Sequence, residues 1–87
     1  MRFEWMPGNS GHVLRHAPLS VAVQVMEADD FLELETSIDG HTVAACGTAN
    51  GKMHFIVFQR TRYEAEKTIY VVTCYKMSRK QRKRRGV

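Results

Sequence analysis

The sequence predicts an α+β domain in which a short first strand and two helices precede a four-stranded antiparallel meander. Three observations predict it. Apart from the basic tail, the helix-like segments lie in the first third of the chain. The apolar runs after Asp29 have the alternation or the β-branched content of strands, and tight-turn signals separate those runs. Helices that precede a meander in this way cover one face of the sheet. A chain of 87 residues has room for one hydrophobic core, so we expect a single domain.

The N-terminal third begins with a strand. MRFEW (1–5) is β-prone and is followed by Pro7, which predicts a strand that ends in a turn. GHVLRHA (11–17) is expected to form a short helix that Pro18 ends.

The segment LSVAVQVMEA (19–28) is ambiguous from its residues alone. Its three valines alternate as in a strand, whereas Ser20 offers an N-cap and the intervening residues suit a helix. Periodicity leaves the two interpretations nearly even.

Four strand-like runs follow, and the turns between them are clearer than any helix signal. In FLELET the leucines occupy one face and Glu33 and Glu35 the other, as in a half-buried strand. Asp39-Gly40 and Asn50-Gly51 are tight-turn sequences, and the second is the strongest hairpin signal in the chain. The expected strands are 31–36, 42–48, 53–59 and 68–75.

The charge of the chain is strongly divided between its two ends. Residues 1–75 hold six Lys and Arg against all nine acids, a balance of −3, while the last twelve residues carry +7 and no acid. Such a division suggests a polyanion or an acidic protein as partner. We therefore divide the chain into a domain at 1–76 and a basic C-terminal tail at 77–87. Ser78 and Gln81 have capping-box spacing, so the tail is expected to open as a short helix.

The cysteines and the lengths of the apolar runs predict a cytoplasmic protein. Cys46 and Cys74 lie in apolar runs without a secretion signal, so we expect reduced, buried thiols. No apolar run approaches the ~20 residues of a membrane span. We expect a soluble, cytoplasmic protein.

The histidines give no metal site. His12 and His16 stand four residues apart, a spacing that can chelate zinc, but HVLRH lacks the Glu of HExxH and no third ligand is evident. His54 lies within a strand, where a structural role is favoured over contact with a substrate.

Several cations flank the expected strand ends, where they can act together. Lys52, Arg60 and Arg62 border the third meander strand, and Tyr75 and Lys76 close the last one. A phenol beside cations can orient a ribose 2′-hydroxyl and stabilise the charge of a phosphorane. For each residue taken alone, a solvated strand end or ordinary strand packing is favoured over a role in a site.

Four segments, spread over nearly the whole chain, resemble the BrnT group of small bacterial type II toxins, within the RelE-like ribonuclease toxins. They are MRFEW, HVLRH, CGTANGKMHFIVF and VVTCYKMSRKQRKR. The chain departs from the group where Tyr75 replaces an Arg that commonly ends the last strand, and where Gln81 replaces a Glu. HVLRH and VVTCY are also similar to a looser family of small domains with no assured activity. Both families place a helix at 19–28.

The resemblance implies a toxin that cleaves RNA without a metal or cofactor, using the substrate's own 2′-hydroxyl as nucleophile. It implies a RelE-like fold, and it implies RNA, free or on the ribosome, and a cognate antitoxin as partners, with oligomers forming through the antitoxin. The alternatives are a non-catalytic nucleic-acid- or ribosome-binding domain of the same fold, and a protein-interaction domain. The catalytic candidates are His16, Tyr75, Arg60 and Lys76. The candidates for binding RNA phosphates are Arg15, Lys52, Arg62, Arg79, Lys80 and Arg82.

Overall fold

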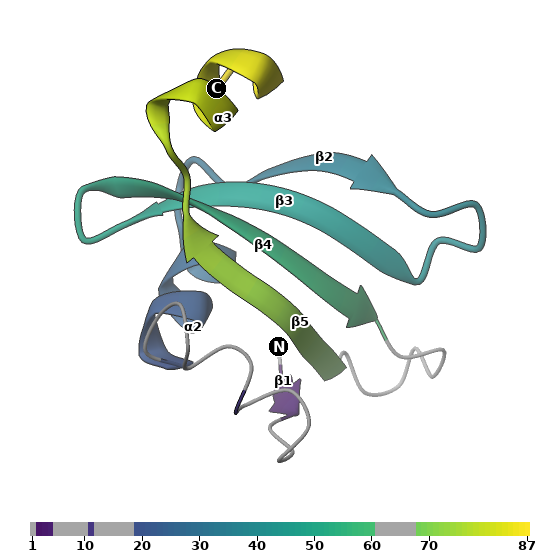
Figure 1. Cartoon of the computed structure of the whole chain (residues 1–87). Coiled ribbons are helices and arrows are strands. Elements are labelled where there is room, and N and C mark those ends of the chain that lie inside the picture. The colour runs from purple at the N-terminus through teal and green to yellow at the C-terminus, as the bar shows by residue number, and fades with distance from the viewer. Residues whose placement is uncertain (1, 5–10, 12–18, 61–67) are drawn as a thin grey trace.

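A five-stranded sheet in the order β1-β5-β4-β3-β2 organises the chain (Figure 1). The computed structural model describes residues 2–4, 11, 19–60 and 68–87. The α+β prediction is confirmed, and β2 to β5 form the expected four-stranded antiparallel sheet. The elements are β1 (Arg2–Glu4), α2 (Leu19–Glu27), β2 (Leu32–Thr36), β3 (Thr42–Ala49), β4 (Lys52–Arg60), β5 (Thr68–Lys76) and α3 (Arg79–Arg85).

The N-terminal strand adds a fifth, parallel member to this sheet. In β1, Arg2 stands opposite Thr68 of β5, and Glu4 opposite Tyr70. The turn between β3 and β4 places Asn50 at φ 53° and Gly51 at φ 73°, the conformation that an Asn-Gly hairpin requires. The helix expected at 11–17 lies outside the described residues, except for Gly11.

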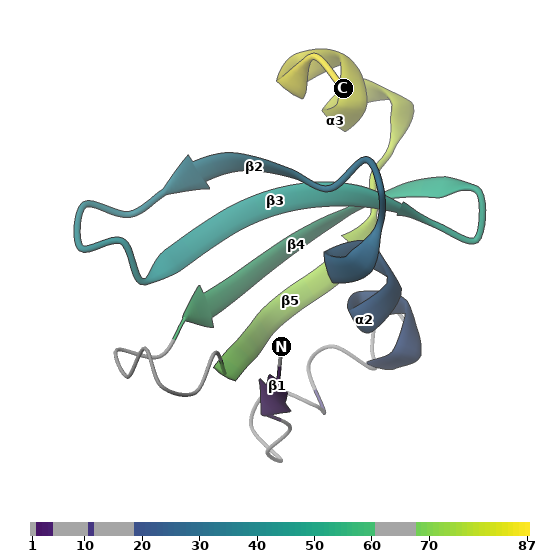
Figure 2. The same ribbon diagram turned by 180° about the vertical axis from the view of Figure 1, so that it is seen from behind.

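The ambiguous segment is a helix, α2, which lies against one face of the sheet (Figure 2). Its buried residues are Val21, Ala22, Val25 and Met26, which fall on one helical stripe. Gly47 allows this packing, because a Cβ there would lie 2.7 Å from the backbone oxygen of Val25. The helix and the sheet enclose the main core, the α2-side core: Val21, Ala22, Val25, Met26, Val43, Ala45, Ala49, Ile56, Phe58, Ile69, Val71 and Cys74.

A second, smaller cluster covers the opposite face of the sheet. This α3-side cluster has Cys46, Phe55 and Met77 at its centre, with Leu34, Ala44, Met53, Val57, Tyr75 and Val87 packed around them. Both cysteines are free and buried, as expected. Burial raises the pKa of the Cys74 thiol to about 11 and also raises that of Cys46.

Two register shifts decide which side chains share a face. The prediction that Glu33 and Glu35 share a face is wrong, because a shift between them sets Glu33 opposite Ala45 and Glu35 opposite Ala44, and these alanines belong to different faces. In the ladder of β5 with β4, Val57 stands opposite Thr73 but Phe58 opposite Val71. Such a bulge changes the facing of every residue beyond it.

Candidate nucleic-acid-binding site

The basic C-terminal segment is a helix with both ends capped. The Ser78 side chain accepts a hydrogen bond from the Gln81 backbone N–H at 3.2 Å, and Gln81 Oε1 accepts one from the Ser78 backbone N–H at 2.8 Å. The predicted capping box is therefore confirmed. At the other end, Gly86 adopts φ 74°, and the Val87 N–H donates to the Arg82 carbonyl at 3.0 Å. These caps offset the repulsion among six cations in seven residues.

Contacts with the sheet hold α3 in place, on the opposite side of the sheet from α2 (Figures 1 and 2). Met77, just before the helix, is buried, and Val87, just after it, packs on the same cluster. The Arg85 guanidinium forms an ion pair with Glu35 of β2 and lies 5.2 Å from the centre of the Phe55 ring. The start, the end and Arg85 of the tail thus contact the domain, while its other cations are exposed.

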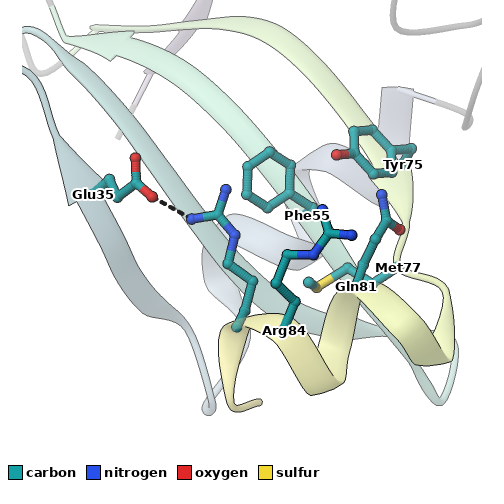
Figure 3. A pocket seen from close by; sticks show the side chains of 7 residues that line it. Glu35, Phe55, Tyr75, Met77, Gln81 and Arg84 are labelled. Atoms are coloured by element: carbon teal, nitrogen blue, oxygen red, sulfur yellow. Dashed lines mark hydrogen bonds and ion pairs between the residues drawn. The ribbon is translucent and has the colours of Figure 1, made fainter.

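A pocket of about 410 Å³ lies between α3 and the sheet (Figure 3). Its sheet side is aromatic, with the rings of Phe55 and Tyr75 tilted by 41° at a centroid distance of 5.4 Å. Its helix side is polar, and Arg84 and Gln81 extend from α3 toward the two rings (Figure 3). The residues that line this α3 pocket are Glu35, Phe55, Tyr75, Met77, Gln81, Arg84 and Arg85.

The phosphate-binding candidates on α3 lie outside this pocket. Arg79 and Arg82 line a shallower hollow on the helix together with Met77, Lys83 and Val87, and Lys80 is exposed. Together they present a cationic outer surface, while Arg84 and Arg85 face the sheet.

Lys52 and Lys76 form a pair of like charges near the base of α3. Lys76 stands opposite His54 in the β4–β5 ladder, and Lys52 precedes His54 by two positions. A side-chain hydrogen bond from Lys52, reinforced by repulsion between the two charges, lowers the pKa of Lys76. A phosphate placed between the two ammonium groups would relieve that repulsion. The structure therefore brings together these two predicted residues.

Arg60 does not join Tyr75. It stands opposite Ile69 of the α2-side core, near the other end of β4, where it forms an ion pair with Glu33 and lies 5.6 Å from the centre of the Phe58 ring. The predicted catalytic residues are thus divided between the two faces of the sheet. His16, Arg15 and Arg62 lie outside the described residues.

His54 is a structural residue. Its side chain is buried on the α2 side, and Nδ1 lies 2.8 Å from the Lys52 carbonyl oxygen. Opposite it stands Gly47, whose lack of a side chain admits α2. His54 therefore supports the strand end that carries Lys52 and Lys76.

Of the seven residues that line the pocket, sequence reasoning named only Tyr75 as a site residue and missed the other six: Glu35, Phe55, Met77, Gln81, Arg84 and Arg85. Phe55 could have been found, because it shares a strand face with Met53 and Val57 on the face left open by α2. Arg84 and Arg85 carried no local signal, since composition alone does not distinguish them from the other cations of the tail.

In the described part of the chain, no helix combines the length and apolar character needed to cross a membrane. Within the same residues, no three His, Cys, Asp or Glu side chains gather as metal ligands would. Comparison of the chain with family models gave no match, and comparison with curated proteins found no significant relative.

Proposed function

We propose that this chain is the toxin component of a bacterial type II toxin–antitoxin system, with a RelE-like fold. In this proposal it binds RNA through α3 and cleaves it without a metal in the pocket beneath that helix. The observation that carries the proposal is the convergence of the Tyr75 ring with Arg84 and Arg85 in one pocket, next to a helix that carries only cations and one Gln.

Binding comes first in this mechanism. The backbone of single-stranded RNA carries one charge per nucleotide, and Arg79, Lys80 and Arg82 present a matching surface outside the pocket. The Lys52–Lys76 pair lies at the end of β5 on the α2 side of the sheet, and in this proposal it binds another phosphate of the same strand. Lys76 therefore acts in phosphate binding in this proposal, and Arg60, engaged with Glu33, has a structural role.

Cleavage then requires only a few groups from the protein. The 2′-hydroxyl of the substrate loses its proton and attacks the adjacent phosphorus, and the bond to the 5′-oxygen of the next nucleotide breaks as that oxygen takes up a proton. The products are a 2′,3′-cyclic phosphate and a 5′-hydroxyl, so the protein supplies orientation, proton transfer and charge stabilisation. Tyr75 orients the 2′-hydroxyl, and Arg85, the other arginine of the pocket beside Arg84, stabilises the charge on the phosphorane oxygens. Arg84 has no ion pair among the described residues, so its charge is available to substrate.

A non-catalytic nucleic-acid-binding domain is the second candidate, and the division of the predicted catalytic residues favours it. Tyr75 remains in the pocket, whereas Arg60 lies on the other face of the sheet. In this alternative the pocket holds RNA without reacting with it.

One comparison separates the two candidates. The wild-type protein, Tyr75→Phe and the matched control Tyr70→Phe are incubated with single-stranded RNA in excess chelator. Tyr70 lies on the same strand but does not line the pocket. The toxin proposal expects cleavage by the wild type and by Tyr70→Phe, and loss of about 10²-fold or more in Tyr75→Phe with binding retained.

Intact RNA with tight binding in all three proteins would support the binding domain instead. Absence of any RNA binding at low salt would contradict both candidates and leave the acidic-partner interpretation. Induction of the wild type in a bacterium gives a second readout, because unchanged growth with intact cellular RNA contradicts the toxin proposal.

A further inference from the structure

The α3 pocket combines an aromatic side with hydrogen-bond donors, and a contact with the helix backbone orients one of them. Gln81 is the key residue, because its amide would otherwise present either a donor or an acceptor to a ligand. Its Oε1 is held by the Ser78 backbone N–H at 2.8 Å. The Nε2 group consequently faces away from the helix backbone, on the side of Tyr75 (Figure 3). Gln81 therefore offers the pocket a donor only.

The other polar groups of the pocket also offer hydrogen-bond donors in preference to acceptors. Arg84 is a fork of N–H donors with no hydrogen bond to the described residues. Glu35 is the only carboxylate among the lining residues, and its Oε1 is already engaged by Arg85. A ligand that fits must be planar, to lie against Tyr75 beside the buried Phe55, and must present acceptors toward α3.

We propose that the α3 pocket binds a guanine base of single-stranded RNA, read on its O6 and N7 edge by Arg84 and Gln81. This inference deepens the proposed function, on which it rests, by naming the base that the site selects. Guanine presents two adjacent acceptors there with no donor between them, and a guanidinium fork matches that pair. Adenine places its 6-amino group at the same position, where it meets donors, and cytosine flanks its acceptors with an amino group.

The volume and the rings of the pocket suit this ligand. A pocket of about 410 Å³ is within the range of small-molecule sites. Stacking of a base on an aromatic side chain contributes to binding whatever the base, so the Tyr75 ring holds the base and the donors select it. Arg82 and Arg79 then lie on the outer side of the helix, where the flanking phosphates would run.

The test measures binding of short oligouridines that carry one central guanine, inosine, 7-deazaguanine, adenine or cytosine. Their 2′-hydroxyls are methylated, so that the strand cannot be cleaved during the measurement. Guanine and inosine, which keep O6 and N7, should bind at least about fivefold more tightly than the other three. The 7-deazaguanine strand is the sharpest comparison, because it differs from the guanine strand at one ring atom.

Two variants locate the preference. Arg84→Lys keeps the charge but removes the guanidinium fork, so it should abolish the preference for guanine. Arg79→Lys, on the outer side of the helix, is the control and should affect the binding of all strands equally. Gln81→Glu keeps the capping box but replaces the donor by an acceptor, so the preference should fall while α3 stays folded.

The outcomes distinguish the inference from the proposal on which it rests. Equal binding of all five strands overturns the guanine site and leaves RNA binding intact. A preference that persists in Arg84→Lys, or that follows the 2-amino group so that inosine binds weakly, also overturns it. Failure of every strand to bind at low salt overturns the RNA-binding proposal itself.

Discussion

Arg85, the last residue of α3, forms an ion pair with Glu35 of β2 across 50 positions of sequence. The same guanidinium lies over the ring of Phe55. Glu35 is 68% exposed, so the pair contributes little to stability, on the order of 1 kcal/mol or less. The pair matters more for the net charge of the α3 pocket, because Glu35 is the only acid among the residues that line the pocket.

Glu35→Gln should strengthen RNA binding. Removal of one negative charge beside Arg85 is worth up to about 1 kcal/mol, so we expect the affinity to rise by about two- to fivefold at low salt. Titration of labelled RNA with the protein measures it. Glu33→Gln is the matched control, since it makes the same charge change on the other face of the sheet, beside Arg60. Equal gains in both variants would show that only net charge matters.

Gly86→Ala should loosen the end of α3. The residue has φ 74°, and an alanine in that conformation costs about 1–2 kcal/mol, although no atom lies near enough to clash. We expect faster amide exchange in α3 and weaker RNA binding. Gly40→Ala imposes a similar backbone cost at φ 77° in a distant turn. It should lower the unfolding temperature without weakening RNA binding, and a parallel loss of RNA binding there would contradict the role of α3.

Gly47→Ala should destabilise the whole domain. The new Cβ would lie 2.7 Å from the Val25 carbonyl oxygen and 3.2 Å from Ala28 Cβ, so α2 must move away from β3. Overpacking of this kind costs about 1–3 kcal/mol, measurable by denaturant unfolding. Gly51→Ala is a comparison in which the added side chain meets no atom, so its cost comes from φ 73° at the hairpin tip and not from contact with α2. Wild-type stability in Gly47→Ala would show that α2 is not held closely against β3.

The free energy of unfolding should fall in acid, in part because Asp30 becomes protonated. Its carboxylate accepts hydrogen bonds from the backbone N–H and the hydroxyl of Thr48, and these bonds lower its pKa below the ordinary 3.8. The folded protein therefore holds this proton less readily than the unfolded chain. The resulting stabilisation is present above pH 3.8 and is lost as the pH falls through the folded pKa. Thermal unfolding at a series of pH values should show a smaller acid loss in Asp30→Asn, and an unchanged profile would exclude this carboxylate as a cause.

The sequence predicted features that depend on neighbouring residues. The capping box of Ser78 and Gln81 and the Asn50-Gly51 turn are local, and both are present. Segment 19–28 was harder, because Val21 and Val25 satisfy a helical stripe while the valines also alternate in sequence. Its conformation is decided by packing against β3, where Gly47 leaves room for the helix.

The candidate site was predictable only in part, because its residues meet through long-range contacts. The shift between Glu33 and Glu35 sends these acids to opposite faces, and a single extra residue in a strand leaves little trace in the alternation. Tyr75 and Lys76 were found at a strand end, yet they lie on opposite faces of β5. The pairing of Arg85 with Glu35 had no signal within either segment.

The parallel pairing of β1 with β5 has a consequence for the order in which the protein forms during synthesis. The first strand leaves the ribosome early, but its partner at Thr68 to Tyr70 follows only after most of the chain. Pairing between such distant segments is slow, because the loop must close before any contact stabilises it. Before β5 is synthesised, β4 also lacks its neighbour on that side, because β5 pairs with both β1 and β4. The cationic helix comes last of all and docks on Phe55 beside Tyr75 of β5. A nascent chain therefore acquires the cationic surface of α3 only when the sheet is complete.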